Sequence, residues 1–84
     1  MTNQKPLEQF KRTISKNDSE YEITINSYEE PIRKSASVRC YTYVQITNNG
    51  EDWGHTYLEN RIGKAESAGV FEMIRKYLDR FKNP

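Results

Sequence analysis

The chain has 84 residues and a formal net charge of +1, and it is 35% hydrophobic and 30% charged. A chain this short forms one domain with a core of about a dozen large side chains, which excludes a deep substrate cavity. The near-zero net charge also gives no whole-molecule attraction to nucleic acid or to a membrane surface. Cys40 is the sole cysteine, which excludes an internal disulfide, and no apolar run is long enough to span a membrane or direct secretion. We therefore expect a single cytoplasmic domain over residues 1–84, with loose ends at 1–5 and 83–84.

The first element in chain order is predicted to be a short helix over Pro6–Ile14. Leu7, Phe10 and Ile14 recur at spacings of three and four residues, and Pro6 suits a first helical turn. So short a helix persists only when it packs against the rest of the fold, and one face of the predicted sheet is a candidate for that contact. Residues 15–19 are polar and are predicted to form a turn.

Two strands are predicted next. Tyr21–Ser27 alternates apolar and polar residues, and Val38–Thr47 does the same over a longer stretch. The segment between them, Glu29–Ser37, contains Pro31 and is predicted to be a loop or an irregular edge. Residues 17–30 hold five acidic residues and no cation, whereas residues 31–50 hold three cations and no acid, so ion pairs between the strands are expected, with a functional basic patch as the alternative.

A hairpin and a third strand follow, over about Asp52–Leu58. Asn48-Asn49-Gly50 predicts a tight turn, because Asn and Gly tolerate positive φ. With a two-residue turn at Asn49-Gly50, the aromatic residues of the third strand join the core. With a three-residue turn the pairing shifts by one residue and the same side chains lie on the outer face of the sheet. These side chains are Trp53, His55 and Tyr57. The Asn-Gly pair favours the two-residue turn.

Over about Lys64–Lys82 the apolar residues recur with the period of an α-helix, which predicts a C-terminal helix. One stripe of this segment is apolar or small, namely Ala65, Ala68, Phe71, Ile74, Leu78 and Phe81, flanked by Val70 and Tyr77. The fold class expected is α+β, with a three-stranded antiparallel β-sheet, a C-terminal amphipathic helix packed on one face and a short N-terminal helix, in the order α-β-β-β-α.

The strand Val38–Thr47 has two different faces, because side chains alternate along a strand. The first face is apolar and is expected to line the core. The opposite face and the basic segment before the strand carry the predicted partner-binding residues, Arg39, Tyr41, Tyr43, Gln45, Arg33 and Lys34. Tyr and Arg are favoured anchors at protein interfaces.

Residues with catalytic or metal-binding chemistry are few. His55 is the only histidine, and the one thiol, Cys40, is expected to point into the core, away from the exposure that a reactive thiolate needs. Gly63-Lys64 precedes a helix without a glycine-rich loop, which is a weak signal for phosphate binding. We predict no catalytic, cofactor-binding or metal-binding residues, and therefore a protein that is not an enzyme.

Two functions remain. The first is a non-enzymatic binding module, a small regulator, inhibitor or subunit that contacts a partner protein or a second copy of itself through Arg39, Tyr41 and Tyr43. The alternative is a nucleic-acid-binding domain that uses the same strip and the basic segment 31–39. Neither involves a membrane. Small stand-alone proteins of this kind are common in phages and mobile elements, which is the origin we expect.

The predicted order of elements carries two resemblances to nucleic-acid-binding families. Helix, three strands and helix resembles the double-stranded-RNA-binding domain over nearly the whole chain. The lysine cluster of that family corresponds here to Gly63–Ala68, which holds one lysine and one glutamate. Three strands and one helix also resemble the DNA-binding domains of phage-type integrases, which insert a sheet face into the major groove. The second resemblance implies that the partner-binding residues named above would form the DNA contact strip.

Overall fold

The structure is a computed structural model that describes residues 5–31 and 37–81. Its elements are β1 (Glu8–Lys16), β2 (Ser19–Pro31), β3 (Val38–Asn48), β4 (Glu51–Glu59), α1 (Lys64–Lys76) and a 3₁₀ turn, η1 (Leu78–Phe81). The fold is α+β with an antiparallel sheet and one C-terminal helix, as the sequence predicts. The predicted loose ends fall, except for Lys5, outside the described residues, and so do Arg33 and Lys34.

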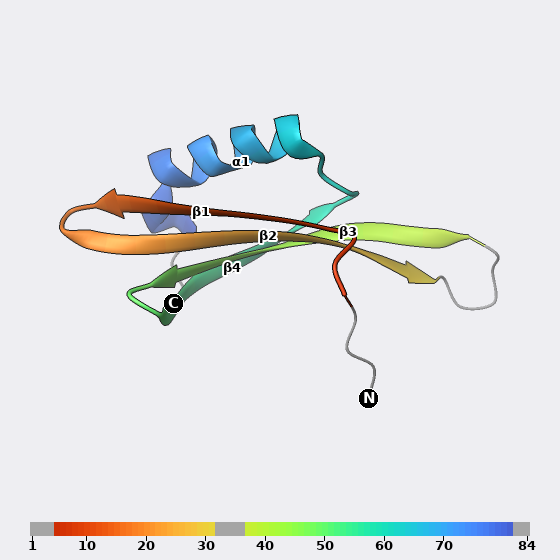
Figure 1. Ribbon diagram of the computed structural model, residues 1–84, viewed down its shortest axis with the longest axis horizontal. Coiled ribbons are helices and arrows are strands. Elements are labelled where there is room, and N and C mark those ends of the chain that lie inside the picture. Colours follow the sequence, from red (N-terminus) through yellow and green to blue (C-terminus); the bar gives the residue numbers. More distant parts are fainter. Residues whose placement is uncertain (1–4, 32–36, 82–84) are drawn as a thin grey trace.

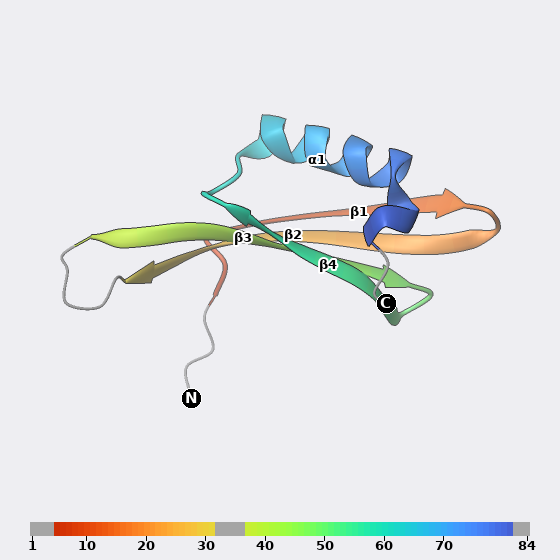
Figure 2. The same ribbon diagram turned by 180° about the vertical axis from the view of Figure 1, so that it is seen from behind.

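The four strands form a single sheet in the order β1-β2-β3-β4, with every neighbouring pair antiparallel. Helix α1 lies across one face of this sheet, which we call the inner face (Figures 1 and 2). Within the described part of the chain, no helix or strand lies on the opposite face, which we call the outer face. The hairpin of β2 and β3 extends past the ends of β1 and β4 (Figure 1).

The predicted N-terminal helix is wrong, and the sheet has four strands instead of three because this segment forms β1. Phe10 and Ile14 are four residues apart, a spacing that fits one face of a strand as well as a helix. The strand places both on the inner face, opposite Ile25 and Tyr21. A tight turn joins β1 to β2, with Asn17 and Asp18 at φ angles of 53° and 63°. Asn and Asp tolerate this left-handed region, so the polar segment closes a hairpin.

Strand β2 is longer than the sequence predicts, because it continues through Glu29, Glu30 and Pro31. Pro31 lies at the end of the strand, where the missing N–H costs least. The predicted loop over Glu29–Ser37 is therefore wrong for its first three residues. The expected pairing of acidic and basic residues occurs here, where Arg39 lies 3.8 Å from the Glu30 carboxylate.

The β3–β4 hairpin combines features of both predicted registers. The turn has two residues, with Asn49 and Gly50 at φ angles of 51° and 88°, and Asn48 faces Glu51. A β-bulge then interrupts the pairing, since Thr47 faces Asp52 but Ile46 faces Gly54. The extra residue is Trp53.

The bulge divides the aromatic residues of β4 between the two faces, because one inserted residue reverses the alternation beyond it. Trp53 packs edge-on against Tyr21 of the inner face, with ring centroids 5.1 Å apart, and its indole N–H donates to the Leu78 carbonyl over 3.5 Å. His55 and Tyr57 lie on the outer face, opposite Gln45 and Tyr43. Neither predicted register places Trp53 on one face of the sheet and His55 and Tyr57 on the other.

The core lies between the inner face and α1. Its buried side chains are Ile14, Tyr21, Ile23, Ile25, Val44, Ile46, Phe71, Ile74 and Leu78. The predicted helical stripe is correct for Phe71, Ile74 and Leu78, but Ala65 and Ala68 are exposed and Ser67 is buried in their place. The Ser67 hydroxyl donates to the Lys64 carbonyl over 2.7 Å, so its burial leaves no polar atom unpaired.

A chain of buried hydrogen bonds fastens the β4–α1 connection to the sheet. The Ile62 N–H donates to the Ser27 hydroxyl over 3.3 Å, and the Thr42 hydroxyl donates to the Asn60 carbonyl over 2.8 Å. The two hydroxyls are 2.9 Å apart, and since Thr42 uses its proton on Asn60, Ser27 is the donor between them. Both side chains are fully buried. Each polar atom therefore has a partner, and the helix is held at a fixed entry point.

Across residues 5–31 and 37–81, no helix is both long enough and apolar enough to cross a lipid bilayer.

Candidate functional site

The outer face brings together side chains from all four strands. Directly paired residues point to the same side of a sheet, so the pairing identifies its members. They include four tyrosines, Tyr28, Tyr41, Tyr43 and Tyr57, which we call the tyrosine cluster. His55, Gln45 and Thr24 form the adjoining row. Since residues 8–16 form β1 instead of a helix, these residues are part of the sheet and do not cover its outer face.

The rings of the tyrosine cluster contact one another. Tyr28 and Tyr41 stack with centroids 5.3 Å apart, and Tyr43 and Tyr57 are 4.9 Å apart and tilted by 45°. His55 extends the group, at 5.9 Å from Tyr43 and 6.2 Å from Tyr57. Tyr57 is 64% exposed, which is more than any other large hydrophobic residue reported for the described chain. The tyrosine cluster thus consists of two ring pairs that together line one hollow, and Tyr57 is its exposed member.

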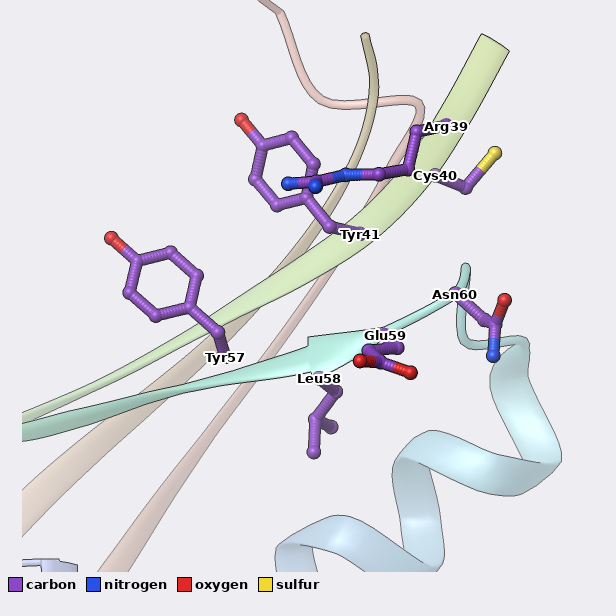
Figure 3. A pocket seen from close by; sticks show the side chains of 7 residues that line it. All are labelled: Arg39, Cys40, Tyr41, Tyr57, Leu58, Glu59 and Asn60. Carbon is purple, nitrogen blue, oxygen red and sulfur yellow. The ribbon is translucent and has the colours of Figure 1, made fainter. Parts of the chain in front are cut away.

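Two shallow hollows border these rings. The smaller, of about 290 Å³, is lined by the tyrosine cluster alone. The larger, of about 720 Å³, lies where β4 ends beside β3 and is lined by Arg39, Cys40, Tyr41, Tyr57, Leu58, Glu59 and Asn60 (Figure 3). The rings of Tyr41 and Tyr57 project side by side in this view, and the Arg39 side chain extends along Tyr41. Both hollows are open, so they suit a partner surface better than an enclosed small molecule.

Carboxylates outnumber cations on the outer face. Among the described residues, strand pairing assigns five acidic side chains to it, Glu20, Glu22, Glu30, Asp52 and Glu59. It assigns two cations, Lys11 and Arg39. Arg39 is 3.8 Å from the Glu30 carboxylate, and its guanidinium carbon is 6.0 Å from the centre of the Tyr41 ring. This side of the sheet is therefore acidic in a chain whose formal net charge is +1.

The pKa of Tyr43 is raised above its ordinary value of 10.0. Partial burial is the largest cause, and the neighbouring Tyr57, Asp52 and Tyr28 contribute further. Each of these disfavours the phenolate. The central ring of the tyrosine cluster therefore stays neutral at physiological pH, with a hydroxyl able to donate a hydrogen bond.

Four of the six predicted partner-binding residues lie together on the outer face: Arg39, Tyr41, Tyr43 and Gln45. Arg33 and Lys34 fall outside the described residues. Sequence reasoning missed Tyr28 because it ended the strand at Ser27. The alternation of Glu22, Thr24 and Asn26 continues to Tyr28 and would have included it.

The thiol and the imidazole of this chain lie on opposite faces of the sheet. Cys40 lies on the inner face in register with Glu29, whereas His55 lies on the outer face opposite Gln45, so the sheet separates the thiol from the imidazole. Within residues 5–31 and 37–81, no three His, Cys, Asp or Glu side chains gather as a metal site requires.

Comparison with known proteins gives no match for this chain among family models, curated proteins or solved structures.

Proposed function

We propose that this protein is a non-enzymatic binding module, a small regulatory, inhibitory or subunit-type protein that contacts a partner protein through the outer face. The observation that carries the proposal is the open tyrosine cluster opposite the helix. Tyrosine has a large, rigid ring and a polar hydroxyl, and it is enriched at the energetic centres of protein interfaces.

The location of the hydrophobic core supports this proposal. The core is formed on the inner face, and the exposed ring of Tyr57 contributes little to it. Clustered exposed aromatic residues on a small domain mark interaction sites more often than single exposed ones do. A domain of this size gains most stability by burying such rings, so a solvent-exposed cluster suggests selection for a contact.

Nucleic-acid binding through the same strip is the second candidate, and the two cations Lys11 and Arg39 favour it. Phosphate recognition needs a surplus of positive charge, because the backbone contacts supply most of the affinity. The described outer face has five carboxylates beside those two cations. The carboxylates repel phosphates, so we rank a protein partner above nucleic acid.

The decisive experiment compares two exposed tyrosines on opposite sides of the molecule. Tyr57 belongs to the tyrosine cluster, whereas Tyr77, at the end of α1, is 44% exposed on the helix side. Partners captured on the immobilised protein from extracts of the source cells are identified, purified and titrated against wild type, Tyr57→Ala and Tyr77→Ala. We expect Tyr57→Ala to weaken binding about five- to thirtyfold, as truncation of an interface tyrosine costs about 1–2 kcal/mol. The control variant Tyr77→Ala should bind as wild type does.

Titration of labelled single- and double-stranded DNA and RNA, at low and at moderate salt, tests the second candidate. Affinity that falls steeply with salt and is lost in Arg39→Glu would support nucleic-acid binding and overturn the protein-partner proposal. Equal effects of Tyr57→Ala and Tyr77→Ala on every purified partner would also overturn it.

A further inference from the structure

We infer that the partner presents a cationic segment, rich in arginine and lysine, to the tyrosine cluster and its surrounding carboxylates. This inference rests on the proposed function, because it names the chemistry of the partner that the outer face receives. It is carried by three observations on the described residues: the charge of the face, the ring contacts within the chain, and the larger hollow.

The first observation is the surplus of negative charge on the described outer face. The outer face carries five carboxylates and two cations, whereas the helix side carries both signs, with Lys64 and Lys76 beside Glu66 and Glu72 on α1. Acidic residues border the tyrosine cluster at both ends, since Glu59 is paired with Tyr41 and Asp52 lies near enough to Tyr43 to raise its pKa. A positively charged partner would be attracted along the whole face.

The second observation concerns how this chain already places cations on aromatic rings. The guanidinium of Arg12 lies 4.6 Å from the centre of the Phe71 ring, and that of Arg80 lies 5.0 Å from the Tyr77 ring. Cations within about 6 Å of a ring face are attracted by its negative quadrupole. On the outer face the Tyr57 ring is 64% exposed, and within residues 5–31 and 37–81 no arginine or lysine lies over it. An arginine or lysine of a partner would make there the contact that Arg12 and Arg80 make elsewhere.

The third observation is the position of the larger hollow. The hollow has a volume of about 720 Å³ and is open to solvent, so a side chain of a partner can enter it. Tyr41 and Tyr57 form one side of it, and Glu59 lies at the end of β4 (Figure 3). Arg39 also lines it, but this guanidinium lies 3.8 Å from the Glu30 carboxylate, which offsets its charge. A long cationic side chain entering the hollow would have an aromatic ring beside it and a carboxylate within the same space.

These observations also rank the other possible occupants of the outer face. A second copy of this chain would bring two acidic faces together, which is repulsive. Nucleic acid would meet the same carboxylates with its phosphates. A cationic protein segment alone complements both the rings and the charge.

The test uses labelled nonapeptides and the full chain. The probe is a peptide that alternates arginine and lysine with glycine, and the matched peptide has glutamate in place of each cation. Fluorescence anisotropy at low and moderate salt measures both. We expect binding of the cationic peptide only, weakening with salt as exposed charges are screened.

Variants assign the contact to the outer face. We expect Tyr57→Ala to weaken peptide binding about two- to thirtyfold, the range spanned by exposed and desolvated cation–π contacts. Tyr57→Phe keeps the ring and should retain most of the affinity. Glu59→Gln should weaken binding several-fold, and its control, Glu66→Gln on the exposed side of α1, should have no effect. Circular dichroism of each variant verifies the fold.

The outcomes separate this inference from the proposed function. Absence of peptide binding while Tyr57→Ala still weakens a captured partner overturns the cationic-segment inference and leaves the binding module intact. Absence of both effects overturns both proposals. A dimer in light scattering that Tyr57→Ala dissociates identifies a second copy as the occupant, and binding of an oligonucleotide sensitive to Tyr57→Ala identifies nucleic acid; either result also overturns the inference.

Discussion

Ile46 and Gln45 are neighbours on β3, yet one is fully buried beneath α1 and the other is exposed on the outer face. The same contrast holds along β2, where Ile23 and Ile25 are fully buried and Thr24 between them faces outward. The inner face has apolar side chains closed by one helix. The outer face has rings and carboxylates that no described element covers. In a sheet that is covered by one helix, only the covered face contributes a buried core. The residues of the other face are therefore not constrained by packing and can be selected for binding.

The largest expected effect tests this division on β3. Ile46→Ala removes a fully buried side chain from the core and should lower the free energy of unfolding by about 2–5 kcal/mol. Gln45→Ala, one residue away on the outer face, should change it by less than about 0.5 kcal/mol. Urea denaturation of both variants measures the difference. Similar losses in the two variants would mean that the outer face also carries stability.

A second change sharpens the description of the inner face, which contains polar residues as well as apolar ones. Thr42→Val keeps the shape of the side chain but deprives the Asn60 carbonyl of its donor and the Ser27 hydroxyl of its acceptor. We expect a loss of about 1–3 kcal/mol, the cost of leaving buried polar groups unpaired. Thr56→Val, at a half-buried site on the same face, is the control. A neutral Thr42→Val would show that the hydroxyl chain does not contribute to stability.

A third prediction concerns the outer face and its response to alkaline pH. Because the pKa of Tyr43 is raised in the folded protein, the unfolded chain releases this proton at lower pH than the folded one does. The contribution of Tyr43 to stability is therefore complete below the ordinary value of 10.0 and is lost as pH rises through the folded value. Urea midpoints measured from neutral pH to above 10 should fall less in Tyr43→Phe than in wild type or Tyr77→Phe. Identical pH profiles in all three would contradict a perturbed Tyr43.

The smallest expected effect lies on the exposed side of α1. Arg75 donates to the Glu72 carboxylate over 2.8 Å, and this bond and the charge of Arg75 lower the pKa of Glu72. Its contribution is present above the unfolded pKa and is lost as pH falls through the folded value. Since the pair is exposed, Glu72→Gln should alter the acid side of the stability profile only slightly, and less at high salt. If Glu72→Gln lowered stability at acid pH much more than Glu66→Gln does, the Glu72–Arg75 pair would have a structural role.

The sequence was sufficient to predict those elements whose hydrophobic spacing fits either a strand or a helix but not both. The alternation of Tyr21, Ile23 and Ile25 and the helical spacing of Phe71, Ile74 and Leu78 both lead directly to the core. The prediction of a helix for the N-terminal segment was wrong because the spacing from Phe10 to Ile14 fits both a helix and a strand. Pairing with β2 decided it, and this contact is between distant parts of the sequence.

The positions of the candidate-site residues were predictable where they follow from alternation along one strand. They were not predictable where they depend on the pairing of two strands. Tyr41 and Tyr43 share a face in any strand over Val38–Thr47, and the structure retains that arrangement. The contribution of Tyr57 depends on the bulge at Trp53, which arises from packing against Tyr21 and the Leu78 carbonyl. No local residue pattern encodes that packing.

The bulge has a consequence for how this surface can change over evolutionary time. Most substitutions alter one side chain of the outer face, whereas a substitution that removes the bulge without changing the length of β4 would shift the pairing by one residue and turn His55 and Tyr57 toward the helix. Both rings would then leave the outer face together, and the edge of the core would have to take in the bulky Tyr57. In related chains the face on which the tyrosine of β4 lies would therefore depend jointly on its distance from the Asn49-Gly50 turn and on the presence of the bulge.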